Sequence, residues 1–251
     1  MDTSYDGIRV TLPSSWQSLT DAQLYYVYGL IADNLSLSQM KAYCFFKFSG
    51  VNVLRRDGSN YVVTDGERRA TVSPTAVAMA VRSLAWLDRL PTYPVRISRI
   101  KGNDAVDAAL HGVAFGEYIA LDNMYQGYLH GQDDSLIDEM AKIMYGNERL
   151  RLNRSQRISV FYWFASVKSL LASTFSSFLQ PASSMTPDNL LAGGASVGQQ
   201  VTDAMNAQIR ALTKGDVTKE REVLALDTWR ALTELDAQAK EYLEMKRRYG
   251  K

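Results

Sequence analysis

The sequence predicts an α+β, mainly helical protein, in which a small antiparallel β-meander packs with helices and a helical C-terminal tail follows. Helix caps followed by apolar residues at helical spacing recur along most of the 251 residues. Residues 51–72 differ, because short valine- and arginine-rich runs alternate there with Asp-Gly pairs. A stretch rich in proline, glycine and serine, 181–198, then separates the tail from the rest of the chain.

The N-terminal segment is expected to form a short strand and two capped helices. Residues Ile8–Leu12 alternate apolar and polar side chains, which is the period of a strand. Thr20 followed by Gln23, and Ser36 followed by Gln39, have the spacing of a capping box. In such a box the hydroxyl and the amide each satisfy a backbone N–H of the first turn, so a helix is predicted to begin at each site.

The meander is predicted at about 51–72. Asp57-Gly58 and Asp65-Gly66 are strong hairpin signals between the valine-rich runs. Ser73-Pro74 then opens a helix, with serine as the cap and proline in the first turn. After that helix, Pro94–Ile100 is expected to add one more strand at the edge of the sheet, where proline is tolerated.

The middle of the chain is expected to be helical from Ala105 onward and to end in a long buried helix at about 156–179. Within it, Ile158–Leu179 is long enough to cross a bilayer. Lys168 lies near its middle, however, and a charge at the membrane centre costs about 3 kcal/mol. We therefore expect this helix to be enclosed by protein and not to span a membrane.

The predicted domain organisation is a mixed α+β domain over 1–180, a flexible linker over 181–198 and a helical C-terminal unit over 199–251. The last helix is predicted to begin at Asp227 or Thr228 and to carry an apolar stripe that needs a surface to cover it. The stripe residues proposed as a partner-binding surface are Trp229, Leu232, Leu235 and Tyr242. Docking in cis, on the main domain, and docking in trans, on another chain, are both open.

The same helix carries acid–base pairs at the spacing of one helical turn. Asp236 precedes Lys240 by four residues, and Glu244 precedes Arg248 by four. Such pairs stabilise a helix by a few tenths of a kcal/mol each.

Composition limits the functional classes. The net charge is +1, whereas proteins that neutralise many phosphates usually carry a strong basic excess, so nucleic acid is not the expected partner. The densest basic segments, Arg149–Arg157 and Lys246–Lys251, support nucleic-acid binding only as an alternative. The single cysteine, Cys44, cannot form an internal disulfide and is interpreted as a buried, inert thiol in a reducing compartment.

No constellation for catalysis is evident in the sequence. His111 and His130 stand outside any recognisable triad pattern, and no GxSxG or GK[ST] motif is present. The densest acidic group is interpreted as a capped, solvated helix start, and consists of Asp133, Asp134, Asp138 and Glu139. We therefore expect no catalytic residue, no cofactor, no metal site and no enzymatic activity.

Three segments carry a family resemblance. NAQIRALTKGDVTKEREVLALDTWRALTELDAQAKE resembles small helical proteins of tailed-phage and prophage virion clusters. LPSSWQSLTDAQL and GEYIALDNMYQGYLHGQDDSLIDEMAKIMYG are similar to proteins encoded near tail genes in prophages and mobile elements of Bacteroides-type bacteria. Together they span about a third of the chain. The resemblance implies a role in virion assembly, such as a tail-assembly chaperone or a minor structural protein, and implies no catalytic residue.

The expected function is therefore that of a non-enzymatic phage or prophage protein that acts by protein–protein contacts with other virion or assembly proteins. Self-association is open. The alternative is a nucleic-acid-binding protein of a mobile element. The expected location is the cytoplasm of the host cell, without membrane association, and incorporation into the virion is left open.

Overall fold

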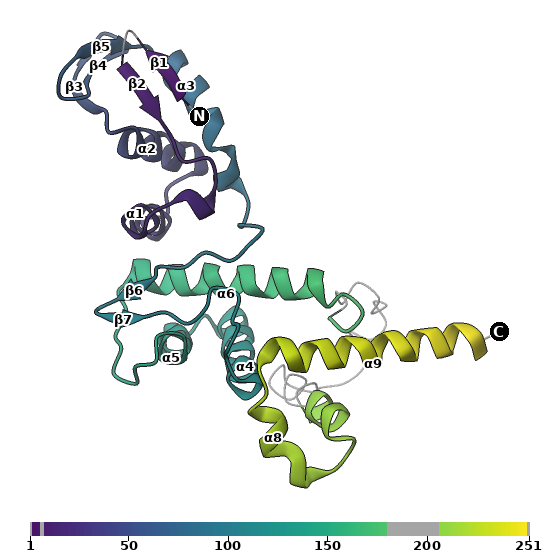
Figure 1. Cartoon of the computed structure of the whole chain (residues 1–251). Helices are drawn as coiled ribbons and strands as arrows, with labels where there is room; N and C mark the ends of the chain where they lie inside the picture. Colours follow the sequence, from purple (N-terminus) through teal and green to yellow (C-terminus); the bar gives the residue numbers. More distant parts are fainter. Residues whose placement is uncertain (1, 6–7, 180–205, 250–251) are drawn as a thin grey trace. The chain divides into compact units, whose positions relative to one another are not determined.

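The computed structural model describes residues 2–5, 8–179 and 206–249 (Figure 1). The fold class predicted from the sequence is confirmed: the chain is mainly helical, with a small antiparallel sheet and a helical C-terminal region. Two compact units divide the chain. Unit 1 comprises Met1–Pro91, Val95–Ile97 and Asn153–Tyr162, and unit 2 comprises Thr92–Pro94, Ser98–Leu152 and Trp163–Lys251.

This division is not the one expected from the sequence. The C-terminal helices belong to the same compact unit as the helices of the middle of the chain, and the N-terminal segment with the meander forms its own unit. The predicted linker, 181–198, lies outside the described residues.

Unit 1 combines two hairpin-connected sheets with helices. Its elements in chain order are β1 (Asp2–Tyr5), β2 (Ile8–Thr11), η1 (Trp16–Ser18), α1 (Asp21–Ala32), α2 (Leu37–Ser49), β3 (Asn52–Asp57), β4 (Asn60–Thr64), β5 (Arg69–Val72), α3 (Pro74–Val81) and η2 (Arg82–Asp88). The predicted meander is confirmed as the antiparallel sheet β3-β4-β5. The predicted first strand is β2, which pairs with β1, a strand that the polar N-terminal sequence did not indicate.

The predicted helix starts of unit 1 are also confirmed. The Gln23 N–H donates to Thr20 Oγ1 over 3.3 Å, and the Thr20 N–H donates to Gln23 Oε1 over 2.9 Å. Ser36 and Gln39 form the second capping box in the same way. The residue after α2, Gly50, has φ +70°, a left-handed conformation that ends a helix without the strain a side chain would add.

Unit 2 consists of helices and one short hairpin. Its elements are β6 (Arg99–Ile100), β7 (Asn103–Asp104), α4 (Phe115–Gly131), α5 (Asp134–Met144), a helix over 206–213, η5 (Val217–Lys219), α8 (Glu220–Leu224) and α9 (Thr228–Tyr249). The remaining helix, α6 (Arg154–Thr174), contributes residues to both units, and the boundary falls between Tyr162 and Trp163.

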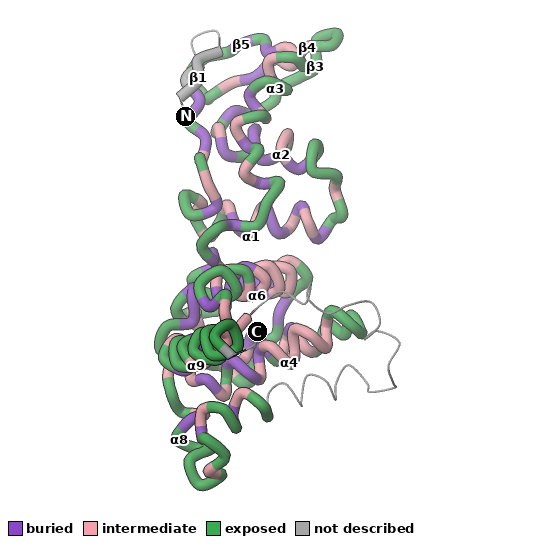
Figure 2. The backbone as a smooth tube through the Cα atoms, turned by 90° about the vertical axis from the view of Figure 1, so that its right-hand side faces the viewer, coloured by how far each residue is buried: buried purple, intermediate pink, exposed green. Residues whose placement is uncertain are grey.

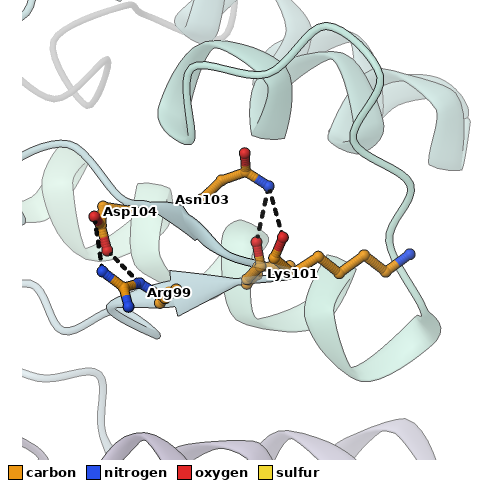
Figure 3. Close-up of polar contacts among 5 residues, drawn as sticks. Arg99, Lys101, Asn103 and Asp104 are labelled. Carbon is orange, nitrogen blue, oxygen red and sulfur yellow. Dashed lines mark hydrogen bonds and ion pairs between the residues drawn. The ribbon is translucent and has the colours of Figure 1, made fainter.

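The strand predicted for Pro94–Ile100 is corrected by the structure. Only Arg99 and Ile100 are extended in a sheet, and they pair with β7 in a separate hairpin and not with the meander. The reason is the turn between them: Lys101 and Gly102 both have positive φ, +49° and +84°, which is the backbone of a tight two-residue hairpin turn. Asn103 Nδ2 further fixes this turn by donating to the carbonyls of Ile100 and Lys101 (Figure 3).

Helical structure expected from Ala105 begins only at Phe115. The intervening residues form turns, because the Asp107 carboxylate accepts the N–H groups of Ala109 and His111 and offers the backbone an alternative to a helix. Leu110 and Gly112 have positive φ, which also interrupts helical geometry.

The long helix expected at about 156–179 is observed as α6, and its lysine has a partner. Lys168 Nζ lies 2.7 Å from Asp122 Oδ1 on α4, outside hydrogen-bond geometry, so the contact is an ion pair. Each side chain is about a quarter exposed, at 28% and 26%. The apolar α6 residues buried in unit 2 are Trp163, Phe164, Val167 and Leu171. Protein therefore covers the apolar face of α6, and the charge is neutralised where that face meets α4.

Candidate interaction surfaces

The start of α9 is held against the rest of unit 2 by hydrogen bonds to main-chain carbonyls. The Thr228 N–H and Oγ1 both donate to the Val113 carbonyl, over 2.9 and 2.8 Å, and the Phe115 N–H donates to the Leu226 carbonyl over 2.7 Å. Asp227 caps the helix, since its Oδ1 accepts the Arg230 N–H. The chain that enters α9 is thus fixed beside the start of α4, and α8 and α9 both contact α4 (Figure 1).

Trp229 is the aromatic anchor of this docked half. Its ring stacks on His111 with ring centres 4.4 Å apart and lies edge-on to Phe175 at 5.4 Å. The indole Nε1 donates to the Ala109 carbonyl over 2.8 Å. A half-buried tryptophan with its N–H satisfied and two ring contacts holds the start of α9 in place.

Leu232 and Leu235 lie in the core, with 0% and 2% of their surface exposed. Beside them, the buried carboxylate of Asp236 accepts the N–H groups of Ser177 and Phe178, over 2.9 and 3.0 Å, and pairs with Lys240 Nζ at 2.7 Å. Burial alone would raise the pKa of Asp236, but the Lys240 ammonium and the two N–H donors outweigh it and lower that pKa. The carboxylate therefore ties α9 to the chain that follows α6.

The four stripe residues proposed from the sequence divide into two groups. Trp229, Leu232 and Leu235 contact the chain itself, so in this structure they dock in cis and offer no surface to a partner. Tyr242 is 62% exposed. Of the four, it alone is placed where it can contact another protein, and a partner-binding role for it stays a prediction.

Most residues in the second half of α9 are exposed, on every side of the helix, as the green end of the helix in Figure 2 shows. Met245, 54% exposed, follows Tyr242 by three residues on the same face. The last turn carries three cations, Lys246, Arg247 and Arg248. The predicted Glu244–Arg248 pair is not formed within the described residues, whereas the Asp236–Lys240 pair is.

A second candidate surface is an apolar groove of about 400 Å³ in unit 1. Leu37 and Leu90 lie at it with 50% and 42% of their surfaces exposed. The lining residues are Trp16, Ile31, Asn34, Leu35, Leu37, Met40, Leu87, Asp88, Arg89, Leu90 and Tyr162. No sequence pattern indicated it, because its lining comes from three stretches that are far apart in the chain, 16–40, 87–90 and 162. Two exposed leucines at one groove suit contact with an apolar side chain of another molecule.

In the alternative basic surface, Arg149–Arg157, buried leucines alternate with exposed arginines at the start of the segment. Leu150 and Leu152 are buried, while Arg149, Arg151 and Arg154 are exposed. Lys101 Nζ, at the hairpin turn in Figure 3, donates to the Arg151 carbonyl over 2.7 Å and so adds a cation beside the segment. The neighbouring Arg99 is paired with Asp104 at 2.6 Å.

The residues considered for catalysis have different surroundings. Cys44 is fully buried and its pKa is raised by burial to about 12, so its thiol is protonated at neutral pH. His111 is stacked on Trp229, and His130 is exposed near the end of α4. In the described ranges, no group of three or more His, Cys, Asp or Glu side chains is arranged to hold a metal ion.

The acidic group at the start of α5 caps a helix. Asp133 is the N-cap, and its Oδ1 accepts the Ser135 N–H over 2.9 Å. Hydrogen bonds from Ser135 lower the pKa of Asp133, which therefore stays ionised, as a capping carboxylate near the positive end of a helix dipole should.

None of the helices in the described part of the chain is both long enough and apolar enough to span a bilayer. Comparison with protein-family models, with curated proteins and with solved structures finds no match for this chain.

Proposed function

We propose that this chain is a non-enzymatic assembly or structural protein of a phage or prophage, similar in role to a tail-assembly chaperone or a minor virion component, and that it acts by protein–protein contacts in the host cytoplasm. The observation that carries the contact role is the division of α9. Its first half is bound by unit 2, and its second half presents Tyr242 and Met245 to solvent beside a basic last turn. An amphipathic helix end of this kind is a common docking element.

The groove of unit 1 supports the same proposal. It provides a concave apolar surface with exposed Leu37 and Leu90, which suits an anchor residue from a partner. The phage or prophage setting rests on the three resembling sequence segments alone.

Affinity purification of the tagged full-length chain from phage-producing cells tests this function. We expect virion or tail-assembly proteins to co-purify, and the gene to lie among tail genes. Recovery of the chain without such proteins, from a gene with no phage genes nearby, would contradict the proposal.

The alternative, nucleic-acid binding, is favoured by one observation: buried Leu150 and Leu152 hold Arg149 and Arg151 outward next to Lys101. Phosphate contacts make affinity fall steeply with salt, by about one decade in affinity per decade of salt for each phosphate neutralised. A titration of double-stranded and single-stranded DNA at several salt concentrations decides this. Under our proposal the chain shows no binding at physiological salt, and a Lys101→Ala, Arg151→Ala variant behaves as wild type.

A further inference from the structure

One further surface of unit 1 combines aromatic rings with a lysine. In this unit α2 lies between α1 and the meander (Figure 1). Tyr43, Phe46 and Lys47 stand three and four residues apart on α2, so they share one face of that helix. Lys47 Nζ lies 5.6 Å from the ring centre of Tyr26 on α1, and the Phe46 ring lies edge-on to Tyr61 of β4 at 6.1 Å. These contacts join the four rings into one surface across α1, α2 and β4.

The meander adds an arginine to this surface. Arg56 of β3 is the register partner of Tyr61 on β4. Directly opposed residues of an antiparallel pair point to the same side of the sheet, so Arg56 lies on the side where Tyr61 meets Phe46. We call these six residues the aromatic–basic surface, which consists of Tyr26, Tyr43, Phe46, Lys47, Arg56 and Tyr61.

The charge of the aromatic–basic surface is positive and unbalanced. Lys47 and Arg56 are exposed, and neither has an ion-pair partner within 4.0 Å among the residues that the structure describes. The sequences of α2 and β4 contain no Asp or Glu, and the acids of α1 stand at its two ends, Asp21 and Asp33. Asp57, at the end of β3, is paired at 3.6 Å with the other arginine of that strand. The two cations are therefore available to carboxylates of another molecule.

The geometry of the rings favours a protein over a nucleic acid as the occupant. Bases stack on aromatic faces that are free and parallel to them. Here the Lys47 ammonium lies over the Tyr26 ring, and the planes of Phe46 and Tyr61 are inclined at 64°. Two cations also neutralise only about two phosphates. Protein–protein interfaces, by contrast, are enriched in Tyr, Phe and Arg.

We propose that the aromatic–basic surface binds an acidic segment of a partner protein, in which apolar side chains stand beside Asp or Glu. The apolar side chains cover the Tyr43 ring, which is 53% exposed, and the carboxylates pair with Lys47 and Arg56. Removal of ring surface from water favours binding, and the ion pairs select a negatively charged segment. The inference goes beyond the proposed function, because it names the chemistry of a partner and does not depend on the phage or prophage setting.

Fluorescence anisotropy with the full-length chain and two labelled peptides tests the proposal. The peptides have equal length, and one repeats Glu-Glu-Leu where the other repeats Gln-Gln-Leu. At a salt concentration of about 0.15 M, we expect the Glu-Glu-Leu peptide to bind about tenfold more tightly, because only its side chains form the ion pairs. Its affinity should fall further as salt is added.

Charge reversal tests the location of the site. Lys47→Glu with Arg56→Glu should lower the affinity for the Glu-Glu-Leu peptide about tenfold or more, since like charges then face each other. Tyr43→Ala should lower it about fivefold, as truncation of an aromatic interface residue commonly does. All three residues are exposed, so the helix content measured by circular dichroism should match that of wild type.

The matched control is Arg55→Glu with Arg69→Glu, which changes the net charge of the chain by the same amount. Both arginines are exposed. Their register partners on β4, Val62 and Thr64, alternate with Tyr61 and so point to the other side of the meander. This variant should bind the Glu-Glu-Leu peptide as wild type does.

Three results would overturn the inference. The first is equal affinity for the two peptides, and the second is a loss of affinity in the Lys47→Glu, Arg56→Glu variant no greater than in its control. The third is tighter binding of single-stranded oligothymidylate than of the Glu-Glu-Leu peptide, lost in the same variant, which would assign the surface to nucleic acid. The first two leave the proposed function untouched, since that fails only if virion proteins do not co-purify, whereas the third would also favour its nucleic-acid-binding alternative.

Discussion

At the scale of single residues, the structure accounts for polar groups that the sequence left unexplained. Lys168 stands in an apolar helix because Asp122 of α4 neutralises it at 2.7 Å. Asp236 follows a buried leucine because its carboxylate accepts the N–H groups of Ser177 and Phe178. In both cases, a charge inside or beside the core is tolerated because an opposite charge or backbone donors from another segment meet it.

Asp236 gives a prediction about pH. Because its pKa is lowered in the folded chain, its ionised form stabilises the fold above the ordinary carboxyl pKa, and this contribution is lost as pH falls through the folded pKa. Asp236→Asn removes the charge and keeps an acceptor oxygen. We expect the variant to unfold about 1 kcal/mol more easily at pH 7, by urea titration. The difference should shrink below pH 4, and a difference that is constant with pH would contradict this role.

Cys44 gives a second prediction at this scale. Its thiol is buried, and its pKa is raised to about 12, so both access and ionisation are suppressed. A maleimide at neutral pH should label the chain in denaturant and leave the native chain unlabelled over the same time, as mass spectrometry can follow. Equal labelling rates in the two conditions would show that Cys44 is not in a closed core.

At the scale of elements, local signals in the sequence were enough to predict helix starts and turns that depend only on residues close to them in the chain. The boxes Thr20–Gln23 and Ser36–Gln39 begin helices as predicted, and the Asp-Gly pairs turn the meander. Such signals act within a few residues, so they can be recognised without knowing the rest of the fold. The late start of α4 was missed because the turns before it depend on the Asp107 side chain, which captures backbone N–H groups that a helix would use.

The candidate surfaces were harder to predict from the sequence. The apolar stripe of α9 was recognised, but the periodicity is the same for docked and free turns, so it could not show that burial ends between Leu235 and Tyr242. The groove of unit 1 was not recognised at all, because residues such as Trp16, Leu90 and Tyr162 are brought together only by tertiary packing.

Because the first half of α9 is buried and the second half is exposed, truncating one side chain in each half should change the stability of the chain by different amounts. Leu232→Ala should lower the free energy of unfolding of unit 2 by about 2–5 kcal/mol, as for other buried leucines. Tyr242→Ala, ten residues later on the same helix, should change it by no more than about 0.5 kcal/mol. Urea unfolding followed by circular dichroism and by tryptophan fluorescence compares the two. Similar losses in both variants would show that the whole helix is buried in solution.

At the scale of the whole molecule, we propose that the chain acts through its surfaces and not through a reaction. The first half of α9 packs against the rest of unit 2, the second half exposes Tyr242 and Met245, and the groove of unit 1 has exposed leucines. The proposed phage or prophage setting rests on the sequence resemblance. The chain divides into two compact units, so we expect a substitution on the surface of one unit to leave the other folded.

The central claim is that these surfaces serve virion assembly. Deletion of the gene from the phage or prophage that encodes it, followed by electron microscopy and titration of the released particles, tests this most directly. We expect incomplete particles or a large loss of infectious titre, restored by the wild-type gene and not by the Tyr242→Glu, Met245→Glu variant. Particles of normal number, morphology and infectivity after deletion would contradict the account.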